Sequence, residues 1–237
     1  MSPLVIEWNN PIALTIVWSA ATIAFYQLGK AIHRHRPYWW TAPLVVTPAL
    51  LLAIALAFHA SYRDYFSGAH WLVVLLGPAT VAFAIPIYEQ RAVVRRHWPV
   101  LLAGALVGSC AAIASAWALA SLMGLSGSLR LSLLPRSVST PFAMAVSGDI
   151  GGAPDLTAVF VVFTGVFGAA LGETMLRWLP LRSALARGAM LGMGAHGVGV
   201  AKALQIGHDE GSIAGLVMVL VGLLNVLAAP LLAQVLR

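Results

Sequence analysis

The sequence predicts an all-α polytopic membrane protein with about seven transmembrane helices and one re-entrant segment. Of its 237 residues, 60% are hydrophobic and 9% are charged, and the mean hydropathy is +0.87. A soluble domain carries about 25% charged residues, so a surface made from this chain would be too apolar for water. A transmembrane helix needs roughly 20 apolar residues, and the apolar share is enough for about seven of them.

Seven apolar stretches are the predicted spans. They cover residues 11–29, 42–58, 69–88, 99–123, 156–176, 184–206 and 212–234. No basic region precedes the first stretch, so it does not have the pattern of a cleaved signal peptide, and we expect it to remain in the mature protein.

The basic residues set the predicted orientation. They give a net charge of +6, and they form short clusters between apolar stretches, which is typical of a membrane protein rather than of a nucleic-acid-binding one. With seven crossings, ten of them fall on one side: Lys30, Arg34, Arg36, Arg91, Arg95, Arg96, Arg177, Arg182, Arg187 and Arg237. The positive-inside bias then predicts a bacterial inner-membrane protein with its N-terminus outside and its C-terminus in the cytoplasm.

Residues 125–155 interrupt the series of spans. This stretch is moderately apolar, and Pro135 and Pro141 break it into pieces too short to cross. A full crossing would also move Arg177, Arg182 and Arg187 to the outer side. We therefore expect a re-entrant segment that enters from outside, which requires surrounding protein or a wet cavity at membrane depth.

The predicted topology is a single membrane domain, residues 1–237, with inverted three-helix repeats. Its parts are an extra N-terminal helix (1–40), repeat one (41–124), the re-entrant segment (125–155) and repeat two (156–237). The middle helices are broken, at Gly77, Pro78 and Pro86 in the first repeat and at Gly192, Gly194, Gly197 and Gly199 in the second. Such paired interruptions indicate the binding site of a transporter, although Gly and Pro also serve close packing in membrane helices.

Several separated motifs carry a family resemblance. Leu76–Tyr88 reads Leu-Gly-Pro-Ala-Thr-Val-Ala-Phe-Ala-Ile-Pro-Ile-Tyr, Leu134–Pro141 reads Leu-Pro-Arg-Ser-Val-Ser-Thr-Pro, and Ala195–Gly199 reads Ala-His-Gly-Val-Gly. Together with Ile150-Gly151-Gly152, and in this order, they resemble the LrgB/CidB family, whose plastid relatives include the glycolate/glycerate translocator. The resemblance covers nearly the whole chain from about residue 40.

The resemblance implies two functions from different classes. Bacterial members were named antiholin- or holin-like regulators of murein hydrolase activity and cell lysis, whereas other bacterial members and the plastid relative look like carriers of small monocarboxylates. We expect a secondary transporter of the pyruvate, lactate and glycolate class, with the regulator of cell lysis as the alternative. The resemblance also implies a small LrgA/CidA-type membrane protein as partner.

The Arg136–Pro141 stretch is the expected binding surface for a carboxylate that has lost its water. A half-helix beginning near Ser137 would offer free backbone N–H groups, with the hydroxyls of Ser137, Ser139 and Thr140 beside them. Arg136 adds a planar fork of donors. The alternative is that a serine only caps the helix and that Arg136 reaches the outer headgroups.

His196 is the expected proton-coupling or anion-contacting residue. Imidazole titrates near physiological pH, and cotransport of a proton removes the cost of importing an anion, about 2.3 kcal/mol per 100 mV. A neutral histidine that bonds a carbonyl of the broken helix is the alternative. Thr80 is expected to face the same cavity, and Asn225 either to contact the substrate or to form an interhelical hydrogen bond.

Two pairings of charged side chains are expected outside this site. Glu173 and Arg177 are four residues apart in the favourable order and predict a local ion pair. Lys202 is expected to extend toward Asp209 and Glu210.

No pattern in the sequence predicts an enzyme, a metal site or a cofactor. The single cysteine, Cys110, excludes a disulfide framework. Gly192–Gly197 spells G-x-G-x-x-G, but no strand precedes it, so it is not a dinucleotide site. Pairs of small residues such as Gly168 with Gly172 and Gly188 with Gly192 indicate close helix packing, within the chain or in a homo-oligomer. The lipid bilayer and a small carboxylate are the other expected partners, and no nucleic acid is.

Overall fold

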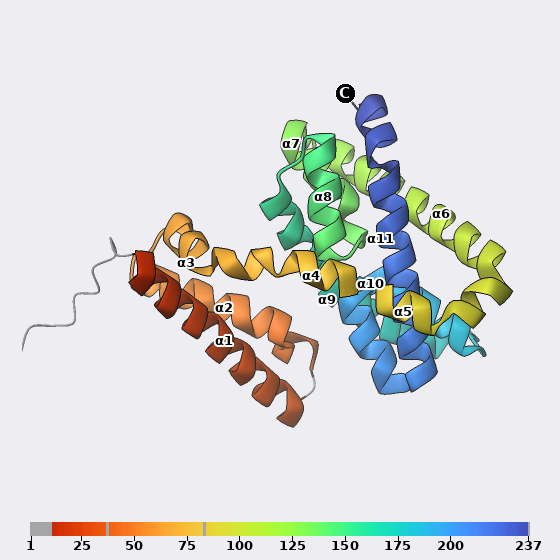
Figure 1. The fold of residues 1–237 in the computed structure, drawn as a ribbon, viewed down its shortest axis with the longest axis horizontal. Coiled ribbons are helices and arrows are strands. Elements are labelled where there is room, and N and C mark those ends of the chain that lie inside the picture. Colours follow the sequence, from red (N-terminus) through yellow and green to blue (C-terminus); the bar gives the residue numbers. More distant parts are fainter. Residues whose placement is uncertain (1–10, 37, 83, 237) are drawn as a thin grey trace, which may run out of the picture. The chain divides into compact units, whose positions relative to one another are not determined.

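The computed structural model describes residues 11–36, 38–82 and 84–236, and its regular structure is helical throughout these ranges. The chain forms two compact units, with unit 1 ending at Pro78 and unit 2 beginning at Ala79 (Figure 1). Four helices are long and apolar enough to cross a membrane: α1 (Pro11–His35), α6 (Arg91–Leu122), α9 (Pro154–Trp178) and α11 (His208–Leu236). The all-helical membrane class is confirmed, whereas the predicted count of seven crossings is not.

Unit 1 contains α1, the short 3-10 turn η1 (Trp39–Thr41), α2 (Pro43–Ala57) and α3 (Tyr62–Val74). Pro43 fits the first turn of α2, where no backbone N–H is needed. Gly68 allows α3 to approach the backbone of α1 at Leu14. The cap of α3 is a reciprocal pair, because Ser61 and Asp64 each bond the other's backbone N–H. The Ser61 hydroxyl and the Ser61 backbone N–H both donate to the exposed Asp64 carboxyl and hold its pKa below the usual value.

The third predicted span, residues 69–88, is divided into short helices. A turn at Leu75 separates α3 from α4 (Leu76–Ala82), and α5 is Ala84–Glu89. Proline lacks a backbone donor and disfavours a long helix across this segment. Thr80 belongs to α4, but its side chain lies outside the described part of the structure, so its role stays a prediction.

Residues 127–150 of unit 2 fold back on themselves and are named hairpin 1. α7 (Gly127–Leu133) continues into the 3-10 turn η2 (Leu134–Ser137), the chain is extended at Val138, and α8 (Thr140–Ile150) returns. The open end is held by the Ser132 hydroxyl, which accepts from the Ala153 N–H at 2.8 Å, and by the Thr157 hydroxyl, which donates to the Ser132 carbonyl at 3.0 Å. The segment predicted to be re-entrant is therefore a helical hairpin, and its depth in a membrane stays a prediction.

Helix α10 (Ala184–Ile206) also folds back, and this differs from the sixth crossing that the sequence predicts. His196 has φ 38° and ψ −122° between two helical arms. Gly199 lies against the backbone of Leu191, although these residues would be about 12 Å apart along a straight helix. We name α10 hairpin 2. Such a backbone costs a non-glycine residue on the order of 1–3 kcal/mol, so the packing around His196 must hold it.

The neighbours of hairpin 2 on α9 confirm that its arms run in opposite directions. Gly172 faces Leu191 of the first arm, and Gly165 faces Val198 just beyond the break. Farther along the second arm, Lys202 Nζ lies 2.8 Å from Glu173 Oε2.

Lys202 therefore lies near the C-terminal end of α9, and the prediction that it extends toward Asp209 and Glu210 is wrong. The second arm of hairpin 2 returns to the end from which α10 started. Glu210 forms an ion pair with Arg187 instead. The predicted pair of Glu173 and Arg177 is confirmed at 3.1 Å.

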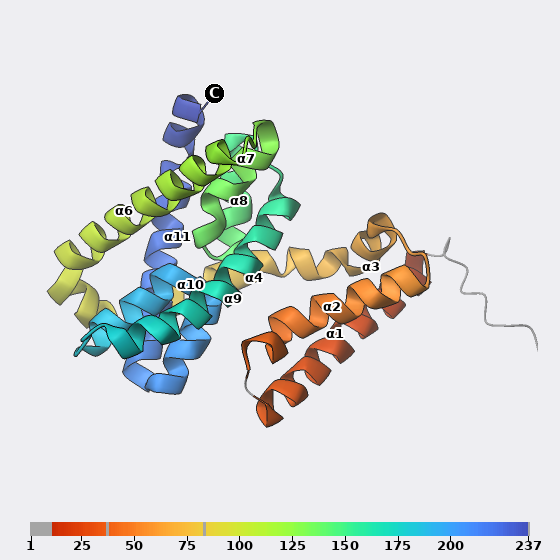
Figure 2. The same ribbon diagram turned by 180° about the vertical axis from the view of Figure 1, so that it is seen from behind.

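α11 begins beside the start of hairpin 2 and runs away from it. Gly188 faces Ile213, and Gly192 faces Ala214. Both ribbon views show the end of α11 marked C beside α7, with α10 at the other end of the helix (Figures 1 and 2). The end of unit 2 that holds α10 also carries six arginines, and we name it the arginine-rich end: Arg91, Arg95, Arg96, Arg177, Arg182 and Arg187.

The C-terminal end of α11 thus lies opposite the arginine-rich end. The sequence predicts that these two ends lie on the same side of the membrane. This relative placement is wrong because α10 folds back as hairpin 2 instead of running straight through.

In unit 2, a hairpin followed by a long helix occurs twice, and the two copies run in opposite directions. α9 runs antiparallel to the first arm of hairpin 2, and α11 runs parallel to that arm. Ser139 and His196 are separated by the same 57 residues (196 minus 139) as Gly165 and Gly222 (222 minus 165). Gly165 and Gly222 also make equivalent contacts. Gly165 faces the His196 ring, and Gly222 faces the ring of Phe142 in hairpin 1. This repeat, 127–178 and 184–236, differs from the predicted three-helix repeat.

The glycines of hairpin 2 offer a matched test of this packing. A β-carbon at Gly192 would lie 2.9 Å from the Ala214 carbonyl carbon, whereas a β-carbon at Gly194 would meet no heavy atom of the described chain within 4 Å. Gly192→Ala is expected to destabilise the protein by about 1–3 kcal/mol, because backbone must move to admit the methyl group. Thermal unfolding in detergent measures this, with Gly194→Ala as control; equal melting temperatures for the two variants would contradict the packing described.

Candidate functional site

The breaks of the two hairpins meet at the middle of α9. Arg136 of η2 lies with Nη1 3.5 Å from the Thr164 hydroxyl oxygen, and His196 Nε2 lies 3.1 Å from the Val161 carbonyl oxygen. η2 also packs against α10. Val161 and Thr164 are about halfway along a helix long enough to cross a bilayer. We name this meeting point the tip site; it includes Arg136, His196, Val161, Thr164 and Gly165.

His196 is buried, with 5% of its surface exposed. A carbonyl oxygen only accepts hydrogen bonds, so Nε2 carries the proton that it donates to Val161. Within the described residues, Nδ1 has no hydrogen-bond partner. The sequence offered a bond to a carbonyl of the broken helix as the alternative to proton coupling, whereas the carbonyl that His196 bonds belongs to α9. This bond leaves one ring nitrogen available for a proton.

The N-terminus of α8 lies at the other break. Ser139 is the N-cap residue, but its side chain makes no cap hydrogen bond, and Pro141 occupies the first turn. A helix interior would not admit Pro141, so α8 begins at Thr140 rather than near Ser137. Ser139 is 7% exposed, Ser137 and Thr140 are half-buried, and none of the three hydroxyls bonds another described residue.

Both breaks expose the start of a helical arm. α8 begins at Thr140, and the second arm of hairpin 2 begins after His196. Unpaired N–H groups and the helix dipole make such an end favourable for an anion. Arg136 adds a guanidinium beside them. The arrangement can bind a small carboxylate between two positive helix ends without a metal ion.

Asn225 does not belong to this group. Its Nδ2 donates to the Ser109 hydroxyl at 2.9 Å and to the Val221 carbonyl at 2.8 Å, which ties α11 to α6. The interhelical hydrogen bond that the sequence allowed is therefore present. The structure brings together Arg136, Ser137, Ser139, Thr140 and His196.

Three contributions from α9 could not be found from the sequence. Val161 acts through its backbone carbonyl, Thr164 is one hydroxyl within an apolar run, and Gly165 gives space to the His196 ring. Only the glycine is a recognisable signal, because it admits a close neighbour. In the part of the chain that the structure describes, no three His, Cys, Asp or Glu residues could hold a metal ion together.

Comparisons with known proteins agree with the motifs. The model of the LrgB-like family matches residues 22–235. YwbG and YxaC of Bacillus subtilis, both named uncharacterized proteins, are 39% and 36% identical over 89% and 92% of this chain and over 94% and 95% of their own. The antiholin-like protein LrgB of Bacillus subtilis is 31% identical over 90% of this chain and 93% of its own. No solved structure matches. The chain belongs to the LrgB-like family of membrane proteins.

Proposed function

We propose that this protein is a secondary carrier of small monocarboxylates in the bacterial inner membrane. The observation that supports this is the meeting of the hairpin breaks at the tip site. Broken helices whose ends meet at the middle of a long helix are typical of transporters that dehydrate an ion at membrane depth. The substrate is moved without chemical change, so no enzyme activity is expected.

The tip site supplies a role for each polar side chain. The carboxylate accepts from the Ser137 and Thr140 hydroxyls and from Arg136, whose planar fork suits two carboxylate oxygens. His196 takes a proton on the free ring nitrogen when the anion binds. Transport of the anion together with one proton is electroneutral. It avoids the cost of about 2.3 kcal/mol per 100 mV that an inside-negative potential imposes on a lone anion.

A regulator of cell lysis is the second candidate, and the names of relatives favour it. The Bacillus subtilis relative at 31% identity is named antiholin-like. A protein of this kind acts by assembling with itself or with a small LrgA/CidA-type partner, and it depends on helix faces and copy number. A carrier depends on the tip site and saturates with substrate.

Uptake into proteoliposomes distinguishes the two candidates. Purified protein is reconstituted with and without an LrgA-type partner, and labelled pyruvate, lactate and glycolate are supplied with an inwardly directed proton gradient. Saturable uptake that the gradient drives is expected. Non-selective leakage of solutes instead would support the regulator, and folded protein without uptake in either preparation would count against the carrier.

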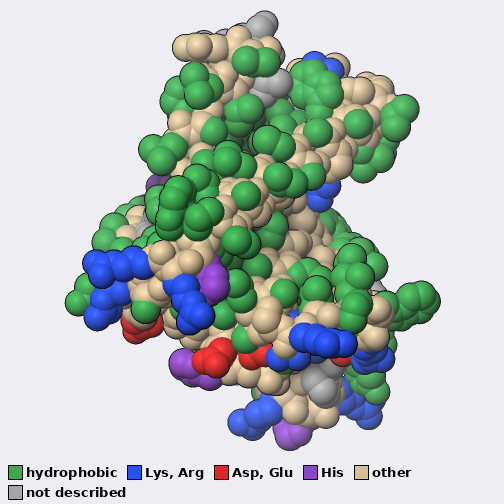
Figure 3. All heavy atoms as spheres, turned by 90° about the vertical axis from the view of Figure 1, so that its right-hand side faces the viewer, with side chains coloured by type: hydrophobic (Ala, Val, Ile, Leu, Met, Phe, Trp, Pro, Cys, Tyr) green, Lys and Arg blue, Asp and Glu red, His purple; other side chains and the backbone are tan. Residues whose placement is uncertain are grey.

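The arginine-rich end is proposed to face the cytoplasm, following the positive-inside bias. Figure 3 shows hydrophobic side chains over much of the drawn surface, which fits a chain that lies in lipid. Since the end of α11 lies opposite the arginine-rich end, the C-terminus is then outside, whereas the sequence predicted it inside.

Cysteine labelling tests this orientation. In a Cys110→Ala background, Gln234→Cys is expected to react with an impermeant maleimide on intact spheroplasts, and Ser183→Cys is expected to react only after permeabilisation. Both positions are exposed and lie at opposite ends of unit 2. Labelling of both from the same side would contradict the fold-back of hairpin 2.

A further inference from the structure

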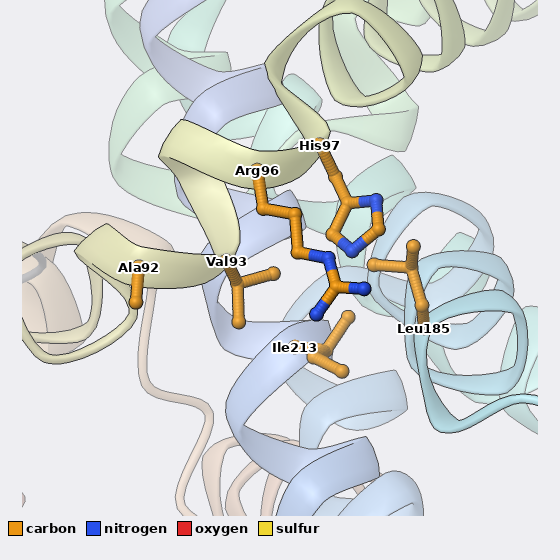
Figure 4. A pocket seen from close by; sticks show the side chains of 6 residues that line it. All are labelled: Ala92, Val93, Arg96, His97, Leu185 and Ile213. Carbon is orange, nitrogen blue, oxygen red and sulfur yellow. The ribbon is translucent and has the colours of Figure 1, made fainter.

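A cavity of about 270 Å³ opens at the arginine-rich end, away from the tip site. Arg96 and His97 of α6 line it together with Leu185 of hairpin 2 and Ile213 of α11, and Figure 4 shows both polar side chains pointing into the space that the two aliphatic residues bound. Neither Arg96 nor His97 bonds or pairs with another residue of the described chain. The cavity thus presents a guanidinium and an imidazole, neither paired within the described chain, above an apolar floor.

The backbone of α6 explains why these donors turn inward. His97 has φ −121° and ψ 15°, which breaks the helical path two residues before Pro99. Proline cannot donate to the carbonyl of Arg95 and its ring clashes with that carbonyl, so the helix bends there. The bend carries Arg96 and His97 toward the start of hairpin 2.

A second, wholly apolar groove of about 310 Å³ follows the same seam between α6 and α11. Its lining includes Trp98, Leu102, Leu220, Leu223 and Leu227. About 18 Å of helix path, with the bend at His97 within it, separates Val93 of the cavity from Ala105 of the groove, and the depth of one leaflet is about 15 Å. The seam therefore has a cationic end near one membrane surface and an apolar path toward the bilayer centre.

We infer that this seam binds an anionic phospholipid, with the headgroup phosphate on Arg96 and His97 and one acyl chain along Trp98, Leu102 and Leu223. Charge complementarity selects the headgroup, because a guanidinium and an imidazole donor match a phosphodiester. The apolar groove selects a chain, which a short carboxylate does not have. The site is separate from the tip site and does not depend on transport.

Native mass spectrometry of the full-length protein in a mild detergent tests the site. Phosphatidylglycerol is expected to bind about tenfold more tightly than phosphatidylcholine, and Arg96→Gln with His97→Gln is expected to remove this preference. Arg95→Gln, an exposed arginine of the same helix outside the cavity, is the matched control and should keep it. Equal binding of phosphatidylglycerol by the double variant would overturn the assignment.

Two further measurements separate a lipid from a soluble anion. Leu223→Trp fills the groove without changing charge, and a loss of phosphatidylglycerol binding of about tenfold is expected. Glycerophosphoglycerol carries the same phosphodiester without an acyl chain and is expected not to compete at millimolar concentration. Full competition by glycerophosphoglycerol, or unchanged lipid binding by Leu223→Trp, would overturn the lipid assignment. Melting temperatures of all variants show that each is folded.

Discussion

Replacing Ser137 and Thr140 together by alanine is expected to lower the kcat/KM of carboxylate uptake by about 100-fold or more. Both hydroxyls flank the break of hairpin 1, are half-buried and have no hydrogen bond to another described residue, so they are available to a bound anion. A hydrogen bond to a charged group contributes about 1.5–3 kcal/mol. The loss of two therefore removes at least about 3 kcal/mol, and each 1.36 kcal/mol is a factor of ten.

The matched control removes one serine and one threonine hydroxyl that already bond their own helix. Ser115 donates to the Ala112 carbonyl, and Thr174 donates to the Ala170 carbonyl, both at exposed positions. Ser115→Ala with Thr174→Ala should transport like the wild type. If the variant at Ser137 and Thr140 melts normally and transports at the wild-type rate, the carboxylate does not bind at the break of hairpin 1.

His196→Gln is expected to abolish accumulation driven by a proton gradient while preserving exchange. Glutamine is polar, and its amide reaches about as far as Nε2 of histidine, so it can still donate to the Val161 carbonyl. It does not titrate. With one proton carried per anion, a gradient of one pH unit supports about tenfold accumulation in the wild type, and the variant should show accumulation near unity.

Counterflow separates loss of coupling from loss of binding. Vesicles preloaded with unlabelled substrate need no proton gradient to take up labelled substrate, so His196→Gln should exchange at a rate close to the wild type. His208→Gln replaces an exposed histidine at the start of α11 and should keep gradient-driven accumulation. An unchanged dependence on the gradient in His196→Gln would remove His196 from the proton path without contradicting the carrier.

The positions of the helices were predictable because apolar stretches of the right length are a strong signal. Hairpin 1 was predictable as an irregular segment, since Pro135 and Pro141 prevent one continuous helix. The break in hairpin 2 was predictable from its glycines, but its fold-back was not, because Ala184–Ile206 has the length of a crossing and contains no proline. The fold-back depends on contacts that are distant in the sequence, such as Gly165 with His196, and the glycines do not reveal them.

The polar residues of the tip site were predictable for a similar reason. Hydroxyl, guanidinium and imidazole groups are rare in apolar stretches, and so Arg136, Ser137 and His196 stand out. Their neighbours on α9 do not stand out, because Val161 contributes only a backbone carbonyl. The placement of Asn225 also needed the structure, since a substrate contact and the bond to Ser109 require the same amide chemistry.

The fold-back at His196 has a consequence for how the chain is made. The arms of hairpin 2 contain about 12 and 10 residues, roughly half of what a bilayer crossing needs. In lipid alone, backbone groups left open at the break cost several kcal/mol each. The contacts that cover the first arm at Gly188 and Gly192 come from α11, which the ribosome synthesises afterwards. Hairpin 2 therefore completes its packing only after the last helix has been inserted, although α9 already covers part of the first arm.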